Sequence, residues 1–222
     1  VLALPARRRT PRTVHFLTLE ETEALLAAPD TKTFTGRRDQ ALLTLAAQTG
    51  LRISELTALT TSDLHTGTGP HVTCTGKGRR YRATPLTAAT LAVLLPYLHE
   101  RATRPGVAAF PGPRGQHLSR DALERRLAKH LSTATKQCPS LAAKHVTTHT
   151  LRHTAAMALM SAGVDTSVIA LWLGHQNATT THIYLHADMT IKERALSRVP
   201  AANTTPGRYR PGDDPIDFLE RL

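Results

Sequence analysis

The amino-acid sequence predicts a mainly α-helical fold of the α+β type, with one small antiparallel sheet of three strands. Apolar residues recur at helical spacing along most of the 222-residue chain, and aromatic residues make up only 4% of it, so we expect an aliphatic core. One stretch, His71–Leu86, instead alternates on either side of a glycine-containing turn, as paired strands do. The length suits one domain with tails.

A basic arm and three helices are expected in the first part of the chain. Residues 1–16 include Arg7, Arg8 and Arg9 between prolines, which is typical of a solvated tail or of an arm that follows DNA phosphates. Thr18 and Glu21 have the spacing of a capping box, which opens the first helix. The predicted helices occupy residues 19–28, 37–48 and 53–59, and Gly50 ends the second.

The predicted sheet is built around a hairpin. His71–Thr75 and Tyr81–Leu86 are its strands, Gly76-Lys77-Gly78 forms its turn, and a short strand near Ser62–Leu64 completes it. The two glycines let Lys77 turn towards a ligand, although a solvated hairpin tip is the commoner role of such a sequence. The spacing of a phosphate-binding P-loop is missing.

The remainder is predicted to be helical apart from a Pro- and Gly-rich loop at residues 104–116. The expected helices span residues 87–101, 119–136, 150–162 and 166–174, followed by one that begins at Asn177 and an amphipathic one at 189–199. We therefore place one folded domain at residues 17–199 and a C-terminal tail at residues 200–222, which becomes acidic at Asp213 and Asp214.

The charge of the chain indicates a polyanionic partner. The formal net charge is +11 and the pI is near 10.5, which favours nucleic acid first and an anionic membrane surface second. The alternative is a charge that only maintains solubility. Cys74 and Cys138 lack metal-ligand spacing, so we expect reduced thiols in a cytoplasmic protein. No apolar run approaches the roughly 20 residues of a membrane span, and the start of the chain lacks the apolar region of a secretory signal.

Two arginines are expected at helix starts, where backbone N–H groups favour an anion. Glu55 follows Arg52 by three residues, so it lies on the same helix face and can orient the guanidinium. Arg152 shares a face with His149 in the segment HTLRH, which places a fixed cation beside a titratable group. Each pair also has a simpler explanation. Arg52 and Glu55 could form a surface ion pair, and His149 could be a helix cap beside an exposed Arg152.

Two further residues follow near the end of the helical region. His175 comes directly after a glycine that suits a helix end, so it should be presented rather than buried, and Tyr184 lies nine residues further on. Taken alone, a tyrosine at helical spacing is more often part of a core than a nucleophile.

The order of these motifs resembles the phage integrase and Xer class of tyrosine recombinases. GLRISEL, TGKGRRYRATPL, HTLRH, LGH and a Thr-x-x-Tyr-x-His segment follow one another over roughly residues 17–199. Each motif is weak by itself, but the ordered set is specific. The resemblance implies a helical catalytic domain that cuts and rejoins DNA through a 3′-phosphotyrosyl intermediate, with no cofactor and no metal.

The resemblance also implies how the scissile phosphate is held. Arg52 and Arg152 would clamp its non-bridging oxygens, and Glu55 would orient the first of these arginines. Lys77 would protonate the leaving 5′-oxygen. Preorganised donors of this kind stabilise the charge that develops in a reacting phosphodiester, typically by about 3–4 kcal/mol for each donor.

The remaining roles concern the nucleophile and its surroundings. Tyr184 would attack phosphorus, His149 would act as acid, base and phosphate ligand, and His175 would donate a hydrogen bond to the phosphate. A tyrosine hydroxyl has an ordinary pKa of about 10, and the surrounding cations would favour its phenolate. The basic residues expected to bind DNA are Arg7, Arg8, Arg9, Arg79 and Arg80.

Double-stranded DNA and other copies of the chain are the partners that the resemblance implies. The expected assembly is a tetramer on two DNA sites, weakly associated or monomeric when free, which acts at the nucleoid in the cytoplasm. Ile191, Ala195 and Val199 form an apolar stripe that could pack on a neighbouring protomer or on its own domain. Family members usually have an N-terminal helical domain on the other face of the DNA. The few residues before the first predicted helix leave open whether one belongs to this protein.

Three other functions stay open at this point. A metal hydrolase could use the i,i+4 pairs His149/His153 and His182/His186, but neither has the glutamate of H-E-x-x-H. A non-catalytic DNA-binding module could use the short helices around Gly163, although the complete set of reactive residues argues against it. A type IB topoisomerase shares the chemistry, and only the compact spacing before the tyrosine favours a recombinase. The sequence specifies neither the target site nor the direction of recombination.

Overall fold

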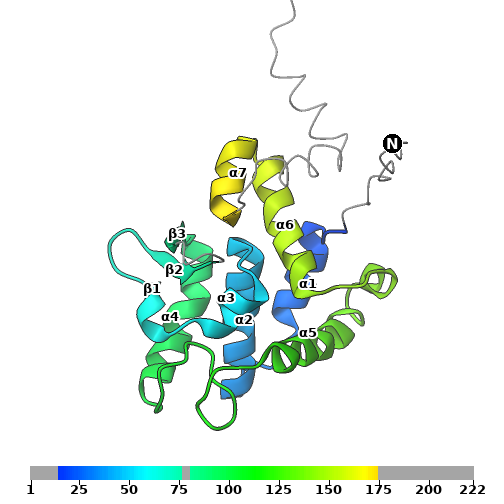
Figure 1. Cartoon of the computed structure of the whole chain (residues 1–222). Helices are drawn as coiled ribbons and strands as arrows, with labels where there is room; N and C mark the ends of the chain where they lie inside the picture. The colour runs from blue at the N-terminus through cyan, green and yellow to red at the C-terminus, as the bar shows by residue number, and fades with distance from the viewer. Residues whose placement is uncertain (1–14, 77–80, 175–222) are drawn as a thin grey trace, which may run out of the picture.

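The computed structural model describes residues 15–76 and 81–174, which form a helical body with one small sheet (Figure 1). The α-helices are α1 (Leu19–Ala27), α2 (Phe34–Thr49), α3 (Ile53–Ala58), α4 (Ala88–Ala102), α5 (Arg120–Ala134), α6 (Thr148–Ser161) and α7 (Thr166–Leu173). The strands are β1 (Leu64–His65), β2 (His71–Thr75) and β3 (Tyr81–Pro85), and the 3-10 turns are η1 (Thr61–Asp63) and η2 (Pro139–Ala143). The predicted mainly helical class with a three-stranded sheet is confirmed.

Threonine side chains cap the N-terminal ends of four helices, α1, α2, α4 and α6. Thr18 accepts a hydrogen bond from the Glu21 amide at 3.2 Å, and the Glu21 carboxylate accepts one from the Thr18 amide at 2.8 Å, as the sequence predicts. Thr33 caps α2 in a similar way, so this helix begins at Phe34, three residues earlier than expected. Thr147 caps α6, so the predicted start at Thr150 was two residues late and His149 is not the cap.

The sheet has the order β1-β2-β3 and is antiparallel throughout. Cys74 pairs with Arg82 in the β2–β3 register. The strand expected near Ser62–Leu64 lies slightly later, at Leu64–His65. The Asp63 carboxylate accepts hydrogen bonds from the amide and the hydroxyl of Thr60, at 2.8 and 2.6 Å, and holds the preceding residues in a 3-10 turn.

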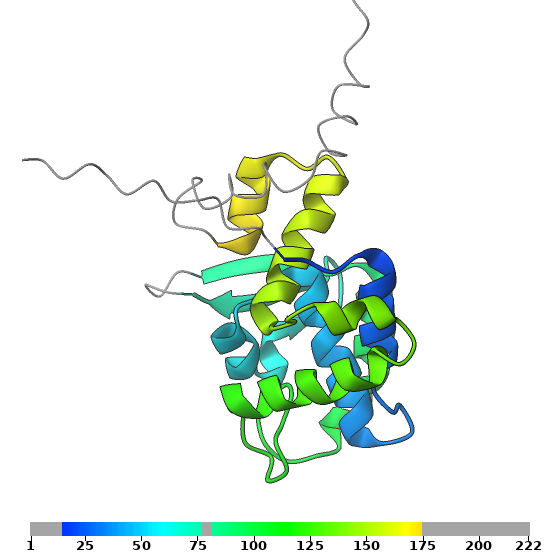
Figure 2. The same cartoon turned by 90° about the vertical axis from the view of Figure 1, so that its right-hand side faces the viewer.

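Helix α2 lies inside the body and packs against α1, α4 and α6. A second apolar cluster joins α6 to α7 through side chains such as Met157, Ile169 and Leu173. Both views show α6 and α7 side by side, with the end of α7 close to the sheet (Figures 1 and 2). This arrangement brings the ends of α2 and α7 together. Among the helices described, none is both long and apolar enough to cross a membrane.

Candidate active site

Arg52 stands at the junction between α2 and α3, where the chain changes direction. Gly50 ends α2 with a left-handed backbone, with φ of 62°, a conformation that glycine adopts without strain. Arg52 is then the N-cap residue of α3, as the sequence predicts. The Glu55 carboxylate binds it twice, accepting from the Arg52 amide at 2.7 Å and from Nη1 at 2.9 Å.

The Glu55 carboxylate is buried, whereas its partner reaches solvent. The side chain of Glu55 is 3% exposed and that of Arg52 is 36% exposed. The simpler explanation, a surface ion pair, is therefore wrong for the carboxylate. A buried carboxylate that lost its cation would be costly, so this pair fixes the guanidinium in one place.

Arg152 approaches the same place from α6 and is almost completely buried. Its Nη1 donates to the carbonyl of Gly50 and its Nη2 donates to the carbonyl of Leu173, both at 2.6 Å. Arg52 donates through Nη2 to the next carbonyl, that of Gly174, at 3.0 Å. The two predicted arginines therefore converge on the C-terminal end of α7, where the helix dipole favours cations.

His149 and His153 continue the site along α6, one turn apart. Their rings make an edge-to-face contact with centroids 4.2 Å apart. His149 remains exposed, and partial burial, together with the charges of Arg152 and Arg52, lowers the pKa of its imidazole. Burial and the neighbouring His149 and Arg152 lower the pKa of His153 to about 4. Both imidazoles are therefore neutral at neutral pH, and neutral His149 can accept a proton.

Sequence reasoning missed a third arginine in this corner. Arg82 of β3 donates through Nη2 to Glu55 at 2.8 Å and through Nη1 to the Leu173 carbonyl at 2.5 Å. The sequence did contain a signal that Arg82 faces inward. Every second residue from Arg82, namely Thr84 in β3 and Leu86 just after it, lies on the inward side. A basic residue on an inward face requires a buried acceptor. We call Arg52, Glu55, Arg82 and Arg152 the arginine corner.

Several predicted site residues lie outside the described residues. They are Lys77, Arg79 and Arg80 between β2 and β3, His175 and Tyr184 after α7, and Arg7, Arg8 and Arg9 in the N-terminal arm. His175 directly follows Gly174, whose carbonyl binds Arg52. The last described residue, Gly174, therefore lies at the arginine corner.

The pairs considered as zinc ligands are only partly covered by the structure. His149 and His153 are neighbours, but residues 15–76 and 81–174 contain no group of three or more His, Cys, Asp or Glu residues placed to hold a metal ion. His182 and His186 lie outside those ranges.

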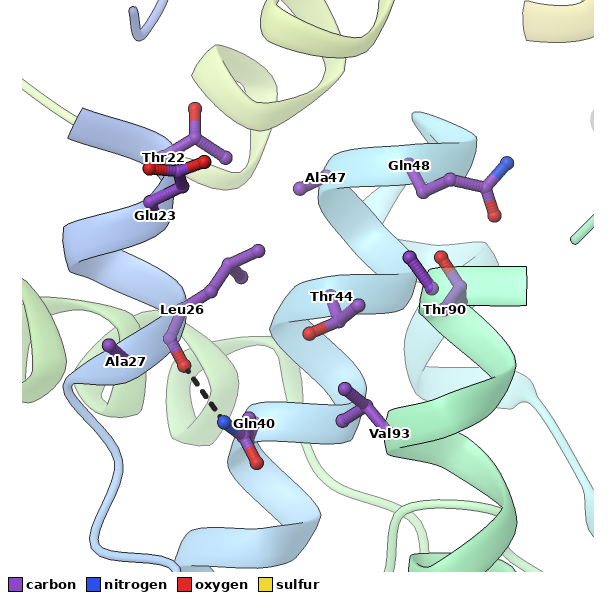
Figure 3. Close-up of a pocket in the computed structure, with 11 residues that line it drawn as sticks. Thr22, Glu23, Leu26, Ala27, Gln40, Thr44, Ala47, Gln48, Thr90 and Val93 are labelled. Carbon is purple, nitrogen blue, oxygen red and sulfur yellow. Dashed lines mark hydrogen bonds between the residues drawn. The ribbon is translucent and has the colours of Figure 1, made fainter. Parts of the chain in front are cut away.

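A separate groove opens between α1, α2 and α4, with a volume of about 480 Å³ (Figure 3). Aliphatic residues from all three helices line it, namely Leu26, Ala27, Ala47, Ala89 and Val93. Gln40 crosses its lower part and donates to the Leu26 carbonyl at 3.3 Å. Of the predicted site residues that the structure describes, none lines this groove, so it is a surface distinct from the arginine corner.

The model of one protein family, described as the phage integrase family, matches residues 15–190 of the chain. The chain belongs to the phage integrase family. The match includes the whole arginine corner together with Lys77, His175 and Tyr184.

Relatives of this integrase-family chain are named as recombinases. The integrase/recombinase y4rC of Sinorhizobium fredii is 48% identical over 222 residues, which is 100% of this chain and 67% of that protein. The tyrosine recombinase XerC of Chlamydia muridarum is 36% identical over 183 residues, 80% of this chain and 56% of that protein. The chain thus spans between about half and two thirds of these relatives.

Solved structures of recombinases have the same fold. XerH bound to a palindromic difH substrate after cleavage matches with a TM-score of 0.71 and 26% identity, over 84% of this chain and 54% of that one. XerA matches with a TM-score of 0.70 and 25% identity, over 82% of this chain and 64% of that one.

Proposed function

We propose that this integrase-family chain is the catalytic domain of a site-specific DNA recombinase that joins DNA covalently to Tyr184. The observation that carries the proposal is the convergence of Arg52 and Arg152 on the end of α7, at the carbonyls of the two residues that precede His175. The names of the relatives and the DNA complex of XerH support it. We expect the protein to act on the nucleoid in the cytoplasm.

The arginine corner would bind the scissile phosphate through its non-bridging oxygens. Arg52 presents a partly exposed guanidinium that Glu55 already orients. Arg152 is anchored through two backbone carbonyls, which fixes the plane of its guanidinium. Donors held in this way need no rearrangement when negative charge builds up on the phosphate.

The reaction would proceed by in-line displacement at phosphorus. The Tyr184 hydroxyl oxygen forms a bond to phosphorus, and the bond to the 5′-oxygen breaks. Neutral His149 accepts the tyrosine proton, while Lys77 protonates the leaving 5′-oxygen. His175 donates a hydrogen bond to the phosphate. The reverse steps with another 5′-hydroxyl rejoin the strand, and the phosphotyrosyl bond supplies the energy that this requires.

The direct test uses duplexes tiled across the DNA next to the gene, each with a nick close to one candidate scissile position. Loss of the short product traps the covalent complex. We expect wild-type protein to form a protease-sensitive adduct with some duplexes, and Tyr184→Phe to bind them without forming it. The adduct should also form in excess EDTA, because Arg52 and Arg152 replace a metal ion. No adduct from any duplex would favour a non-catalytic DNA-binding module. Adduct formation with relaxation but no strand exchange would favour a topoisomerase.

For assembly, we propose that the groove between α1, α2 and α4 receives residues 189–199 of a neighbouring protomer. The aliphatic lining of the groove suits the apolar stripe of Ile191, Ala195 and Val199. A contact between two different surfaces closes into a ring when it repeats around an axis, which is the symmetry that four protomers on two DNA sites require.

Two changes on opposite sides of this contact test the assembly. Ile191→Asp with Val199→Asp alters the stripe, and Ala89→Glu alters an exposed residue of the groove. Each variant should fold and bind one DNA site normally but fail to form higher-order complexes on two sites, as measured by gel mobility and light scattering. If the stripe variant unfolds in isolation, the helix belongs to its own domain and the proposed contact is wrong.

A further inference from the structure

The arginine that sequence reasoning missed occupies a central position in the corner. Arg82 is held on both sides, by Glu55 through Nη2 and by the Leu173 carbonyl through Nη1. Its side chain is 12% exposed, compared with 36% for that of Arg52, so it lies behind the exposed arginine. Its Nε is buried and has no hydrogen-bond partner among the described residues. A buried cation with an unpaired donor is costly and calls for a reason.

Arg82 shares each of its two acceptors with one of the proposed phosphate-binding arginines. Glu55 accepts from the Arg52 guanidinium on Oε1, and from both the Arg52 amide and Arg82 on Oε2. The Leu173 carbonyl receives Arg152 at 2.6 Å and Arg82 at 2.5 Å. Any movement of Arg82 would therefore alter the partners of both arginines at once.

The end of α7 is shaped around the same guanidinium. Gly174 ends α7 in the left-handed region, with φ of 64°, and a Cβ at this position would collide with Nη1 of Arg82. Glycine thus serves both the backbone conformation and the close approach of Arg82. Strand β3, α3 and the end of α7 meet at this one side chain.

We infer that Arg82 is a positioning residue for strand cleavage, which fixes Arg52 and Arg152 through Glu55 and the Leu173 carbonyl without touching the DNA itself. This inference rests on the proposed cleavage activity. Two guanidinium groups bind the one carboxylate, and the third, that of Arg152, shares the Leu173 carbonyl with Arg82, which leaves an excess of positive charge in the corner. The phosphate would neutralise that excess, and Arg82 would hold the two contacting arginines in register until it arrives.

The test compares Arg82→Met, which keeps the length of the side chain, with Arg82→Lys and with Arg37→Met. Arg37 pairs with Glu100 at 2.7 Å near the opposite end of α2, so it is a matched arginine–glutamate pair away from the corner.

Single-turnover cleavage of saturating nicked DNA should be roughly 10- to 100-fold slower for Arg82→Met. Its affinity for DNA should remain within about threefold of wild type, because Arg82 acts on the transition state and not on binding. Arg82→Lys should cleave faster than Arg82→Met but slower than wild type. An ammonium can bind one acceptor strongly but cannot donate to Glu55 and the Leu173 carbonyl at once as the guanidinium does. Arg37→Met should cleave at the wild-type rate.

Two further measurements distinguish the positioning of Arg52 and Arg152 from other roles that Arg82 could have in cleavage. In a double-mutant cycle, the rate defects of Arg82→Met and Glu55→Gln should combine to less than their sum, because both changes release Arg52 whereas only Arg82→Met also releases Arg152. On DNA with sulfur at the 5′-bridging position, the Arg82→Met defect should persist, since sulfur leaves without a proton donor. Additive defects, or rescue by sulfur, would overturn the inference, the latter by assigning Arg82 to the placement of Lys77.

The stability of each variant completes the test. If Arg82→Met lacks a cooperative unfolding transition, the same comparisons are made on Arg82→Lys, and a wild-type rate there would overturn the inference. Lower stability with an unchanged rate per folded molecule would reduce Arg82 to a structural residue. Failure of wild-type protein to form any adduct would instead reject the proposed function itself.

Discussion

Each end of helix α2 lies beside a buried carboxylate that is bound by two arginines. Near the N-terminal end, Asp39 accepts from Arg38 at 2.7 Å and from Arg126 at 3.0 Å. Just beyond the C-terminal end, Glu55 accepts from Arg52 at 2.9 Å and from Arg82 at 2.8 Å. By distance and burial of the carboxylate, the two clusters are nearly the same.

They differ in what the arginines do with their remaining donors. At the Asp39 cluster, Arg38 is buried and donates to the Pro111 carbonyl at 2.5 Å, and His130 lies 2.8 Å from the same carboxylate. Burial acts to raise the pKa of Asp39, but the hydrogen bond from His130 and the charge of Arg38 hold it below its ordinary value. We call it the closed cluster, because Arg126 is its one partly exposed member, and it ties α2 to α5 and to the loop at Pro111.

The arginine corner, in contrast, is open and has too many cations for its carboxylate. Arg152 adds a third guanidinium, and the side chain of Arg52 is 36% exposed, compared with 24% for that of Arg126. A buried ion pair therefore does not identify a binding site by itself. A binding site is indicated by an excess of oriented cations that reaches solvent at the end of a helix, because a bound anion can neutralise the excess charge.

The largest effect is expected for Arg152→Ala. Removal of one anchored guanidinium should slow adduct formation on nicked DNA by about 10³-fold, because the transition-state phosphate loses a preorganised donor. Arg152→Lys should also be strongly impaired, since a lysine cannot bridge the Gly50 and Leu173 carbonyls in one plane. A rate within tenfold of wild type for the alanine variant would remove Arg152 from the phosphate site.

The matching change at the closed cluster should affect stability instead. Asp39→Asn leaves Arg38 buried without its counter-charge, so the free energy of unfolding in urea should fall by about 3 kcal/mol. Cleavage per folded molecule should not change. Glu100→Gln breaks the more exposed pair with Arg37 and should cost less than about 1 kcal/mol. Equal losses for the two variants would contradict the distinction between them.

The sequence predicted the local part of the arginine corner because its signals lie within one helical turn. Arg52 and Glu55 are three residues apart after a glycine, and Arg152 lies in the segment HTLRH near the start of its helix. The alternation in β3 placed Arg82 on the inward side, but its partners lie 27 and 91 residues away, so no local pattern could identify them. The Asp39 cluster was missed for the same reason, since His130 is 91 residues distant.

Errors at the element ends have local causes. The strand near Ser62 began late because the Asp63 side chain bonds to Thr60 and completes a 3-10 turn first. The helix expected from Thr150 began early because Thr147 is a better N-cap than a histidine. Lys77, His175 and Tyr184 stay predictions, because they lie outside the described residues.

His153, which lies next to Arg152 of the arginine corner, should make the stability of the protein depend on pH. The pKa of His153 is lowered to about 4 in the folded protein, so between this value and about 6.5 the unfolded chain binds more protons. Stability should therefore be complete above pH 6.5 and fall by about 2–3 kcal/mol as the pH is lowered towards 4. His153→Gln should flatten the unfolding free energy over this window. Parallel curves for the two proteins would show that burial does not lower the pKa of His153 in the folded protein.

The smallest effect concerns charge away from both clusters. DNA affinity should fall steeply with salt, by about 0.9 log units per log unit of salt for each phosphate neutralised, as the net charge of +11 suggests. Deletion of residues 1–13, with Arg7–Arg9, should reduce this slope by the amount that about one to three phosphate contacts contribute. The cleavage rate at saturating DNA should not change. An unchanged slope would make the arm a solvated tail.

The two clusters are compared most directly by Arg52→Ala and Arg126→Ala. Both arginines are partly exposed, and each binds a buried carboxylate at about 3 Å. We would measure single-turnover adduct formation on saturating nicked DNA, per folded molecule, together with the free energy of unfolding. Arg52→Ala should slow adduct formation by about 10²- to 10³-fold, whereas Arg126→Ala should leave the rate unchanged and lower only stability. Equal rates for the two variants would contradict the claim that the arginine corner is the phosphate site.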